Sequence, residues 1–106
     1  MIVEYIRYKI PRERHTEFEE AYTNASQSLN VSKHCQMYEL THCAEEPELY
    51  ILRIEWDSLD GHMNGFRSSP EFREFFKYIQ PFYKDIQEMR HYELTKVTKR
   101  KGSSVA

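Results

Sequence analysis

The first ten residues alternate between two sets of side chains, as the residues of a β-strand do. The even positions hold Ile2, Glu4, Ile6, Tyr8 and Ile10. The odd positions that alternate with them hold Val3, Tyr5, Arg7 and Lys9. Because β-branched and aromatic residues are common in both sets, residues 1–10 are predicted to form a strand that ends at Pro11.

Residues 13–29 change to the spacing of an amphipathic helix. Their apolar positions recur every three or four residues, at Phe18, Ala21, Tyr22, Ala25 and Leu29. Glutamates gather in the first half of this segment, where negative charge stabilises the positive end of a helix dipole. A helix is therefore predicted to follow the first strand.

The next two apolar segments, residues 34–43 and residues 48–56, are predicted to pair as a hairpin around the turn at residues 44–47. Asp57 or Ser58 can then cap a short helix that carries four residues on one face: Leu59, His62, Met63 and Phe66.

A second helix is predicted to start at Ser69, because a capping serine followed by proline is typical of a helix start. Its buried positions are expected to be Phe72, Phe75, Phe76 and Ile79. Pro81 interrupts the helical pattern, and residues 88–97 are predicted to form the last strand.

The predicted order is therefore β-α-β-β-α-β, which is typical of an α+β, ferredoxin-like fold with a four-stranded antiparallel sheet and both helices on one face. Each predicted strand carries apolar residues on both of its faces. A chain of this size has no second layer for the other sheet face, so we expect a homodimer in which a second copy covers it.

Composition agrees with a single small domain. The chain has 106 residues, of which 40% are hydrophobic and 14% are aromatic, so aromatic side chains are expected to dominate one core. The N-terminal segment has no uninterrupted apolar run, and no segment is long enough to span a bilayer. We therefore expect a cytoplasmic protein with no membrane partner.

The formal net charge of −2 is unevenly distributed, because the last eleven residues carry four basic side chains and no acidic one. Residues 98–106 are predicted to be a solvated, disordered basic tail, and no nucleic-acid partner is expected. Cys35 and Cys43 are eight residues apart on one predicted strand, which is too far for a disulfide bond between them.

Residues 56–76, with the sequence WDSLDGHMNGFRSSPEFREFF, resemble the antibiotic biosynthesis monooxygenase family. The resemblance rests on a Trp, a helix-borne His, and the pairs Phe-Arg and Ser-Pro followed by Phe-x-x-Phe-Phe. The flanking sequences ILRIEW and MRHYE strengthen it. The similarity extends over about residues 1–97, which are assigned to one antibiotic biosynthesis monooxygenase-like domain.

This resemblance implies a dimeric ferredoxin-like α+β barrel. Members of the family include cofactor-independent oxygenases that act on phenols, quinols and polyketide aromatics, and others that degrade haem. The haem-degrading members use an Asn on the first strand and a Trp and a His in the last helical region. The comparable positions here are Ile6, Gly65 and Phe76, so haem degradation is not expected.

A cofactor-independent oxygenase needs an acidic organic substrate, a base that forms its anion, and an apolar pocket where the anion meets oxygen. His62 is the candidate base, because it shares a helix face with Leu59, Met63 and Phe66 and its ordinary pKa suits proton transfer. The alternative is that His62 is a packed histidine with one structural hydrogen bond.

Several other residues are candidates for ligand binding. Arg67 could hold an anionic group of a ligand, or it could be an ion-pair partner at a helix junction. His91 could face either the pocket or the dimer interface, because strand parity alone does not decide between them. Aromatic residues that could line the pocket, or belong only to the core, are Tyr5, Tyr38, Trp56 and Phe66.

We expect no metal ion and no tightly held cofactor. The pairs His34-Cys35 and His42-Cys43 lie too far apart on one predicted strand to share a zinc ion. The chain has only 3 glycines and no glycine-rich loop for a nucleotide phosphate.

The sequence therefore favours a cofactor-independent monooxygenase that oxidises a small aromatic, phenolic or quinol-type compound between helices and sheet. The alternative is a non-catalytic binding or sensing module for a hydrophobic metabolite or haem. A third possibility is an assembly unit that acts through its dimer face alone.

Overall fold

The computed structural model describes residues 1–102 of the chain. The strands of this part are β1 (Ile2–Lys9), β2 (Cys35–His42), β3 (Leu49–Trp56) and β4 (Ile86–Glu93). The main helices are α1 (His15–Val31) and α2 (Pro70–Ile79). Shorter helical segments are η1 (Arg12–Arg14), η2 (Gly61–Phe66) and η3 (Gln80–Asp85).

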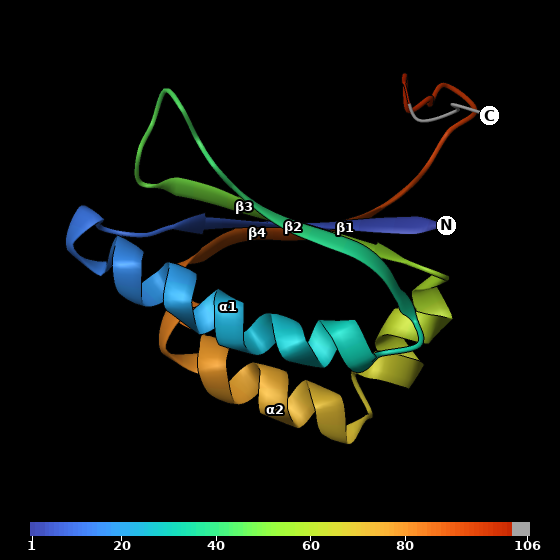
Figure 1. Ribbon diagram of the computed structural model, residues 1–106, viewed down its shortest axis with the longest axis horizontal. Coiled ribbons are helices and arrows are strands. Elements are labelled where there is room, and N and C mark those ends of the chain that lie inside the picture. The colour runs from blue at the N-terminus through green and yellow to red at the C-terminus, as the bar shows by residue number, and fades with distance from the viewer. Residues whose placement is uncertain (103–106) are drawn as a thin grey trace.

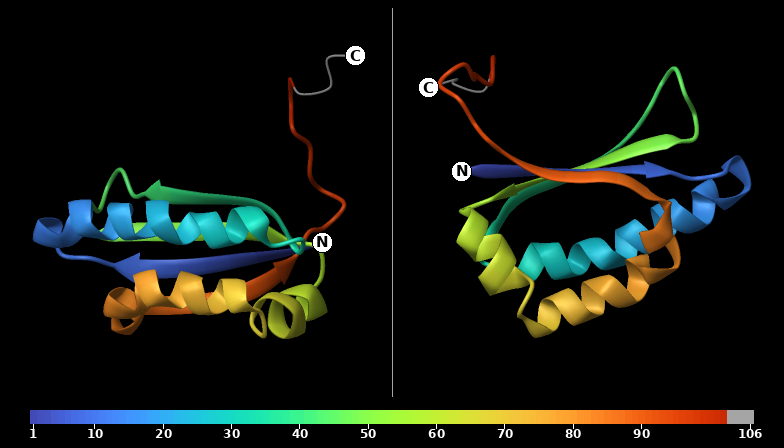
Figure 2. Two further views of the ribbon diagram at one scale, coloured as in Figure 1. Left: turned by 60° about the horizontal axis from the view of Figure 1, so that its bottom comes forward. Right: turned by 180° about the vertical axis from the view of Figure 1, so that it is seen from behind.

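The strands form one antiparallel sheet in the order β2-β3-β1-β4. The central strand β1 pairs with β3, which places Ile6 opposite Leu52, and with β4, which places Glu4 opposite His91. Figure 1 shows α1 and α2 beneath one face of the sheet, and Figure 2 shows the same two layers from other directions. The predicted α+β, ferredoxin-like fold is confirmed.

An aromatic core lies between the sheet and the helices, with Phe18 of α1 at its centre. The Phe18 ring centroid is 4.9 Å from that of Tyr8 and 4.8 Å from that of Tyr50. The ring of Phe82, from η3, is 5.1 Å from Phe18 on another side. Edge-to-face packing of this kind adds stability beyond the area buried.

The connection between β3 and α2 forms the tight helical turn η2 in the region where a short helix was predicted. The Nδ1 atom of His34 lies 2.9 Å from a carboxylate oxygen of Asp57, at the start of this connection. A Cβ atom at Gly65 would come within 2.5 Å of the His34 ring, so only glycine allows η2 to approach so closely. This packing holds His62 in a buried position.

The predicted start of the second helix is confirmed. The side chain of Ser69 accepts a hydrogen bond from the backbone N–H of Phe72 at 3.2 Å, and Pro70 occupies the first helical position. Helix α2 then turns Phe75 and Ile79 towards the core.

The last strand was predicted at residues 88–97, but β4 begins two residues earlier and ends four residues earlier. Its pairing with β1 ends at the Ile2–Glu93 pair, because β1 itself has no further residues to oppose it. Beyond it, the backbone N–H of Leu94 donates one more hydrogen bond, of 3.4 Å, to the carbonyl oxygen of Met1.

Residues 98–102 belong to no helix or strand, and Figure 1 shows the C-terminal segment leaving the sheet on the side away from the helices. The rest of the predicted basic tail, residues 103–106, lies outside the described residues. Disorder of this tail stays a prediction.

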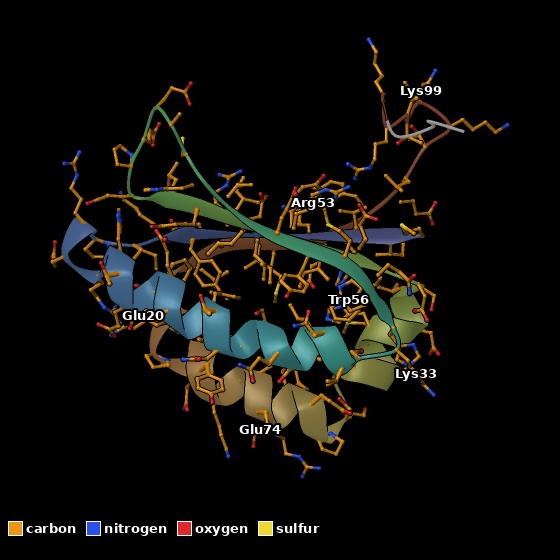
Figure 3. The ribbon with its side chains drawn as sticks, viewed as in Figure 1. Glu20, Lys33, Arg53, Trp56, Glu74 and Lys99 are labelled. Carbon is orange, nitrogen blue, oxygen red and sulfur yellow. The ribbon has the colours of Figure 1, made fainter. Side chains whose placement is uncertain are left out.

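The helices leave the other face of the sheet uncovered. In Figure 3, Arg53 points to this outer face, whereas Trp56 on the same strand points towards the helices. Tyr5, Ile51 and Tyr92 are exposed there, but the face also carries charge, since Arg53 contacts the Glu55 carboxylate at 2.6 Å. The expected second copy on this face stays a prediction.

Two other expectations concern the whole chain. Among residues 1–102, no helix is both long enough and apolar enough to cross a membrane. Cys35 and Cys43 are both free; Cys35 begins β2, and Cys43 directly follows its last residue.

Candidate functional site

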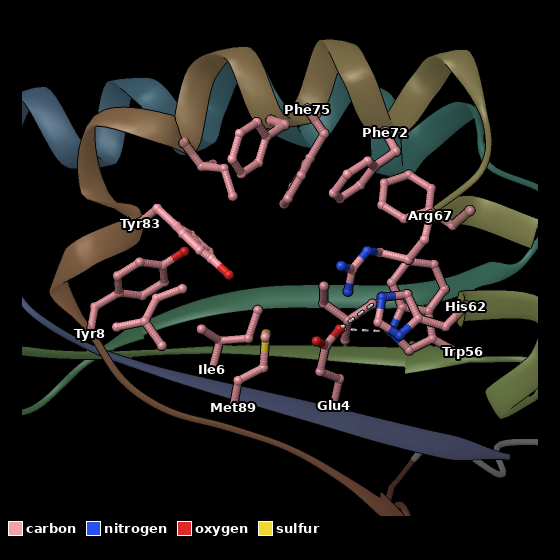
Figure 4. A pocket seen from close by; sticks show the side chains of 15 residues that line it. Glu4, Ile6, Tyr8, Trp56, His62, Arg67, Phe72, Phe75, Tyr83 and Met89 are labelled. Carbon is pink, nitrogen blue, oxygen red and sulfur yellow. Dashed lines mark hydrogen bonds and ion pairs between the residues drawn. The ribbon is translucent and has the colours of Figure 1, made fainter. Parts of the chain in front are cut away.

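A cavity of about 70 Å³ lies between the sheet and α2. Figure 4 shows that its walls are mostly aromatic and aliphatic, with Glu4, His62 and Arg67 gathered at one end. The lining residues on the sheet side are Glu4, Ile6, Tyr8, Ile54, Trp56, Ile86 and Met89. Those on the helical side are His62, Phe66, Arg67, Phe72, Phe75, Phe76, Ile79 and Tyr83.

The polar end is built around Glu4, which lies at an even, core-facing position of β1 and is only 2% exposed. The indole N–H of Trp56 donates a hydrogen bond of 3.0 Å to its Oε1 atom. Burial raises the pKa of Glu4 to about 7, although the Trp56 hydrogen bond and the positive charge of Arg67 act in the opposite direction. The carboxyl group can therefore gain or lose a proton near neutral pH.

His62 packs beside Glu4 and is 3% exposed. Its ring is stacked on the Trp56 indole, with a centroid distance of 4.3 Å. Its Nδ1 atom lies 2.7 Å from Nε2 of His91, while its Nε2 atom lies 3.6 Å from Oε1 of Glu4. Both ring nitrogens of His62 thus face groups of the protein.

The charge of His62 follows from this packing. Burial, followed by the charges of His91 and Arg67, lowers the pKa of His62 to about 3. The imidazole is therefore neutral at physiological pH, and one nitrogen of the His62–His91 pair donates the shared hydrogen bond to the other.

The position of His91 decides a question that the sequence left open. His91 is directly opposite Glu4 in the β1–β4 register, and its side chain meets His62 on the helix side of the sheet. Burial and the nearby Arg67 lower its pKa. His91 therefore belongs to the polar end of the site, although it stands behind the cavity wall and does not line the cavity.

Arg67 follows directly after η2 and is exposed along part of its length. Its guanidinium lies 5.0 Å from the ring centroid of Phe72, on which it rests. Figure 4 shows the guanidinium reaching over the cavity towards Glu4. An anionic oxygen in the cavity would therefore meet a positive charge.

The other sequence candidates form two groups: those that line the cavity and those that do not. His62, Trp56, Phe66 and Arg67 line the cavity, as expected. Tyr5 does not line it, because it lies at an odd position of β1 and packs on the outer face, where its ring centroid is 5.5 Å from that of Tyr92.

Tyr38 does not line the cavity either. Its side chain faces the helix layer, but β2 is the edge strand on the side of β3 away from β1. There the Tyr38 hydroxyl donates a hydrogen bond of 2.7 Å to Asn30 of α1.

Sequence reasoning missed Glu4, although a signal was present. Glu4 is the charged residue among the even, otherwise apolar or aromatic positions of residues 1–10. A charge at a position that faces a core is rare unless it is paired or functional. The rim residues Tyr83 and Met89 were also missed, because no periodicity distinguishes a rim from a core.

The same polar end raises the question of a metal ion, since ligand atoms of Glu4, His62 and His91 all lie within 4.8 Å of one another. His62 turns Nδ1 towards His91 but Nε2 towards Glu4. The closest approaches of His62 to its two neighbours are therefore made by different nitrogens of the ring. The expected absence of a metal ion stays a prediction.

Comparison with known proteins places the chain in a family. Residues 1–78 match the family model of the antibiotic biosynthesis monooxygenases. The Bacillus subtilis (strain 168) protein YczJ is 32% identical over 77 residues, which cover 73% of this chain and 81% of YczJ.

Solved structures show the same fold. A proposed antibiotic biosynthesis monooxygenase from Bordetella bronchiseptica aligns with a TM-score of 0.74 at 25% identity, covering 89% of this chain and 96% of its own. A protein from Deinococcus radiodurans, also proposed to be such a monooxygenase, aligns with a TM-score of 0.74 at 14% identity, covering 96% and 100%. The chain belongs to the antibiotic biosynthesis monooxygenase family.

Proposed function

We propose that this protein is a cofactor-independent monooxygenase that oxidises a small aromatic compound of the phenol or quinol type. The single observation that carries the proposal is an aromatic cavity with one polar end, where a carboxyl group, an imidazole and a guanidinium meet. Membership of the family supports the same reaction class.

The chemistry needs no bound group if the substrate supplies the electrons. A phenol has a keto tautomer with a CH₂ carbon, and removal of one of its protons leaves an electron-rich anion that can add O₂. The O–O bond of the resulting peroxide then breaks. One oxygen stays on the carbon as a carbonyl, and the other leaves as water with the two hydrogens of that carbon.

The protein's part is to bind, orient and deprotonate the substrate. The apolar walls exclude water from the anion, and Arg67 can hold its oxygen. The neighbouring carboxyl and imidazole groups provide the place for the proton.

The size of the cavity limits the substrate. Its volume of about 70 Å³ is smaller than the roughly 150 Å³ of a protein cavity that binds benzene. Tyr83 and Met89 line the cavity and are 47% and 43% exposed, so they can turn aside at its rim. We expect one-ring substrates to be preferred over substrates with several fused rings.

Oxygen uptake tests this proposal. The purified protein should consume O₂ above the uncatalysed rate with at least one member of a panel of substituted phenols and quinols. Glu4→Gln should lower this rate strongly, while Glu20→Gln, the same chemical change on the exposed side of α1, should leave it unchanged. A rate no higher than that of buffer across the panel would contradict the proposal.

A binding or sensing module is the second candidate, and the closed packing around His62 favours it, because the ring is stacked on Trp56 and its Nδ1 atom is hydrogen-bonded to His91. In that case a hydrophobic ligand should raise the melting temperature with its concentration, while mass spectrometry recovers the ligand unchanged. Haem bound to the protein would be detected by its Soret band.

A further inference from the structure

We propose that Glu4, and not His62, accepts the substrate's proton, and that His62 and His91 are positioning residues that hold the carboxyl group in place. This inference rests on the proposed function and deepens it. Glu4 and His62 both line the cavity, but they differ in how firmly the protein already holds their polar atoms.

Glu4 is placed to meet a substrate directly. It lines the cavity, and Figure 4 shows its carboxyl group pointing into the open space beneath Arg67. The 3.0 Å hydrogen bond from Trp56 fixes one carboxyl oxygen and prevents the side chain from turning away. A proton acceptor must lie within hydrogen-bond reach of the proton that it removes, and Glu4 satisfies this for a ligand in the cavity.

His62 lacks this freedom. The ring is stacked face to face on Trp56, with an interplanar angle of 13°, so it cannot swing into the cavity without losing that contact. One of its nitrogens faces His91 at 2.7 Å and the other faces Glu4 at 3.6 Å. Nδ1 is thus engaged in a hydrogen bond with His91, and Nε2 is directed at the Glu4 carboxyl group, although 3.6 Å is too long for a hydrogen bond.

The charged and titratable groups around Glu4 come from every element packed against it. His91 approaches from β4, His62 from η2, and Arg67 from the segment after η2. Burial raises the pKa values of the phenols of Tyr8 on β1 and Tyr22 on α1, and the nearby charge of Glu4 adds a smaller effect in the same direction. Burial and these neighbouring groups together leave the pKa of Glu4 at about 7, which suits a general base. The pKa of His62, about 3, is too low for that role.

The proton step balances without any further reactant. The substrate C–H bond breaks, its electron pair stays on the substrate as an anion facing Arg67, and the proton forms a new O–H bond on the Glu4 carboxylate. The same proton can return to the peroxide after O₂ has added. Glu4 is thus unchanged after each turnover, and the two histidines carry no net proton.

Hydrogen–deuterium exchange without oxygen tests this step apart from oxygenation. The probe is phenylacetone, a one-ring aromatic ketone whose benzylic CH₂ group is acidic, incubated anaerobically in D₂O with the protein and followed by mass spectrometry. Relative to wild type, Glu4→Gln should lose at least about 100-fold of the exchange rate, which is the size expected for a lost general base. His62→Gln and His91→Gln should each lose less than about 10-fold.

The pH profile separates a positioning role from a merely structural one. Because the base must be ionised, exchange by wild type should rise with pH through a midpoint near the pKa of Glu4, about 7. His62→Gln and His91→Gln should move this midpoint and keep most of the plateau rate. A purely structural effect would lower the plateau and leave the midpoint in place.

Control variants keep the result interpretable. Glu20→Gln should exchange at the wild-type rate, since Glu20 is exposed on α1. Glu4→Asp keeps the carboxyl group but withdraws it by one methylene, so it should retain more exchange than Glu4→Gln. Circular dichroism should show that the Glu4 variants fold, because glutamine can still accept the Trp56 hydrogen bond.

The outcomes distinguish this inference from the proposed function. Exchange that survives Glu4→Gln but disappears in His62→Gln would overturn the inference, as would wild-type exchange no faster than buffer. Exchange that depends on Glu4 without any oxygen uptake would uphold the inference and refute the monooxygenase.

Discussion

Burying Glu4 costs the folded protein free energy whenever its carboxyl group is ionised. The pKa of Glu4 is about 7 in the folded protein, against an ordinary value of 4.5. Between these values the folded state holds a proton that the unfolded state has lost, so the stability due to this group falls as pH rises. Glu4 is 2% exposed, so solvent screens the effect little.

Glu4→Gln should remove this dependence. We expect the unfolding free energy of wild type, relative to that of Glu4→Gln, to fall by about 3 kcal/mol as pH rises from 4.5 to 7 and to stay level above that. Urea unfolding of both proteins at a series of pH values measures this difference. An equal pH dependence of the two proteins would show that Glu4 titrates normally.

His62 acts in the opposite direction, and because it is present in both proteins, their comparison removes most of its contribution. The pKa of His62 falls from 6.5 to about 3 on folding, so its contribution to stability is present above pH 6.5 and is lost on acidification. Wild type alone would therefore report a mixture of both groups.

The sequence could single out His62, Arg67, Trp56 and Phe66, which line the cavity, because all four lie in the one stretch of residues 56–76 that resembles the family. It could not predict the raised pKa of Glu4, because the pKa of a carboxyl group depends on burial by residues that are distant in the chain. Glu4 and Trp56, for example, are 52 positions apart.

At the scale of elements, strand alternation predicted β1 correctly, but packing decided which of its faces meets the helices. The even face carries Glu4, Ile6 and Tyr8 into the core, and this leaves Tyr5 outside. The placement of His91 depended on the register of β4 against β1, which shifts between Arg7 and Tyr8. A register shift of this kind has no reliable mark in the sequence.

We propose that a second copy of the chain docks on the outer face of the sheet. Ile51 and Tyr5 are exposed there, 36% and 38% respectively, and a lone sheet of this size leaves that face in water. Ile51→Lys should therefore convert a dimer into folded monomers, because it places a charge in the buried contact.

Sedimentation velocity at micromolar concentration measures this change. Tyr78→Lys is the matched control, since Tyr78 is 42% exposed on α2 in the other layer, and it should remain dimeric. A wild-type protein that sediments as a monomer would contradict the proposed assembly.

At the scale of the whole molecule, the sheet and the helix pair enclose a cavity whose polar and apolar ends come from different parts of the chain. The polar end joins β1, β3, η2 and β4, while α2 and η3 supply most of the aromatic wall. A site assembled in this way exists only in the folded protein. The order of elements was predictable from local patterns, but the cavity follows from their packing.

The most direct test of the whole account is oxygen isotope labelling with the phenol or quinol that supports the fastest oxygen uptake. Under ¹⁸O₂ the wild-type protein should place one labelled atom in each product molecule and the other in water, and Glu4→Gln should yield no more labelled product than buffer. Product oxygen that comes from labelled water, or equal labelling by wild type and Glu4→Gln, would contradict a monooxygenase that works through this site.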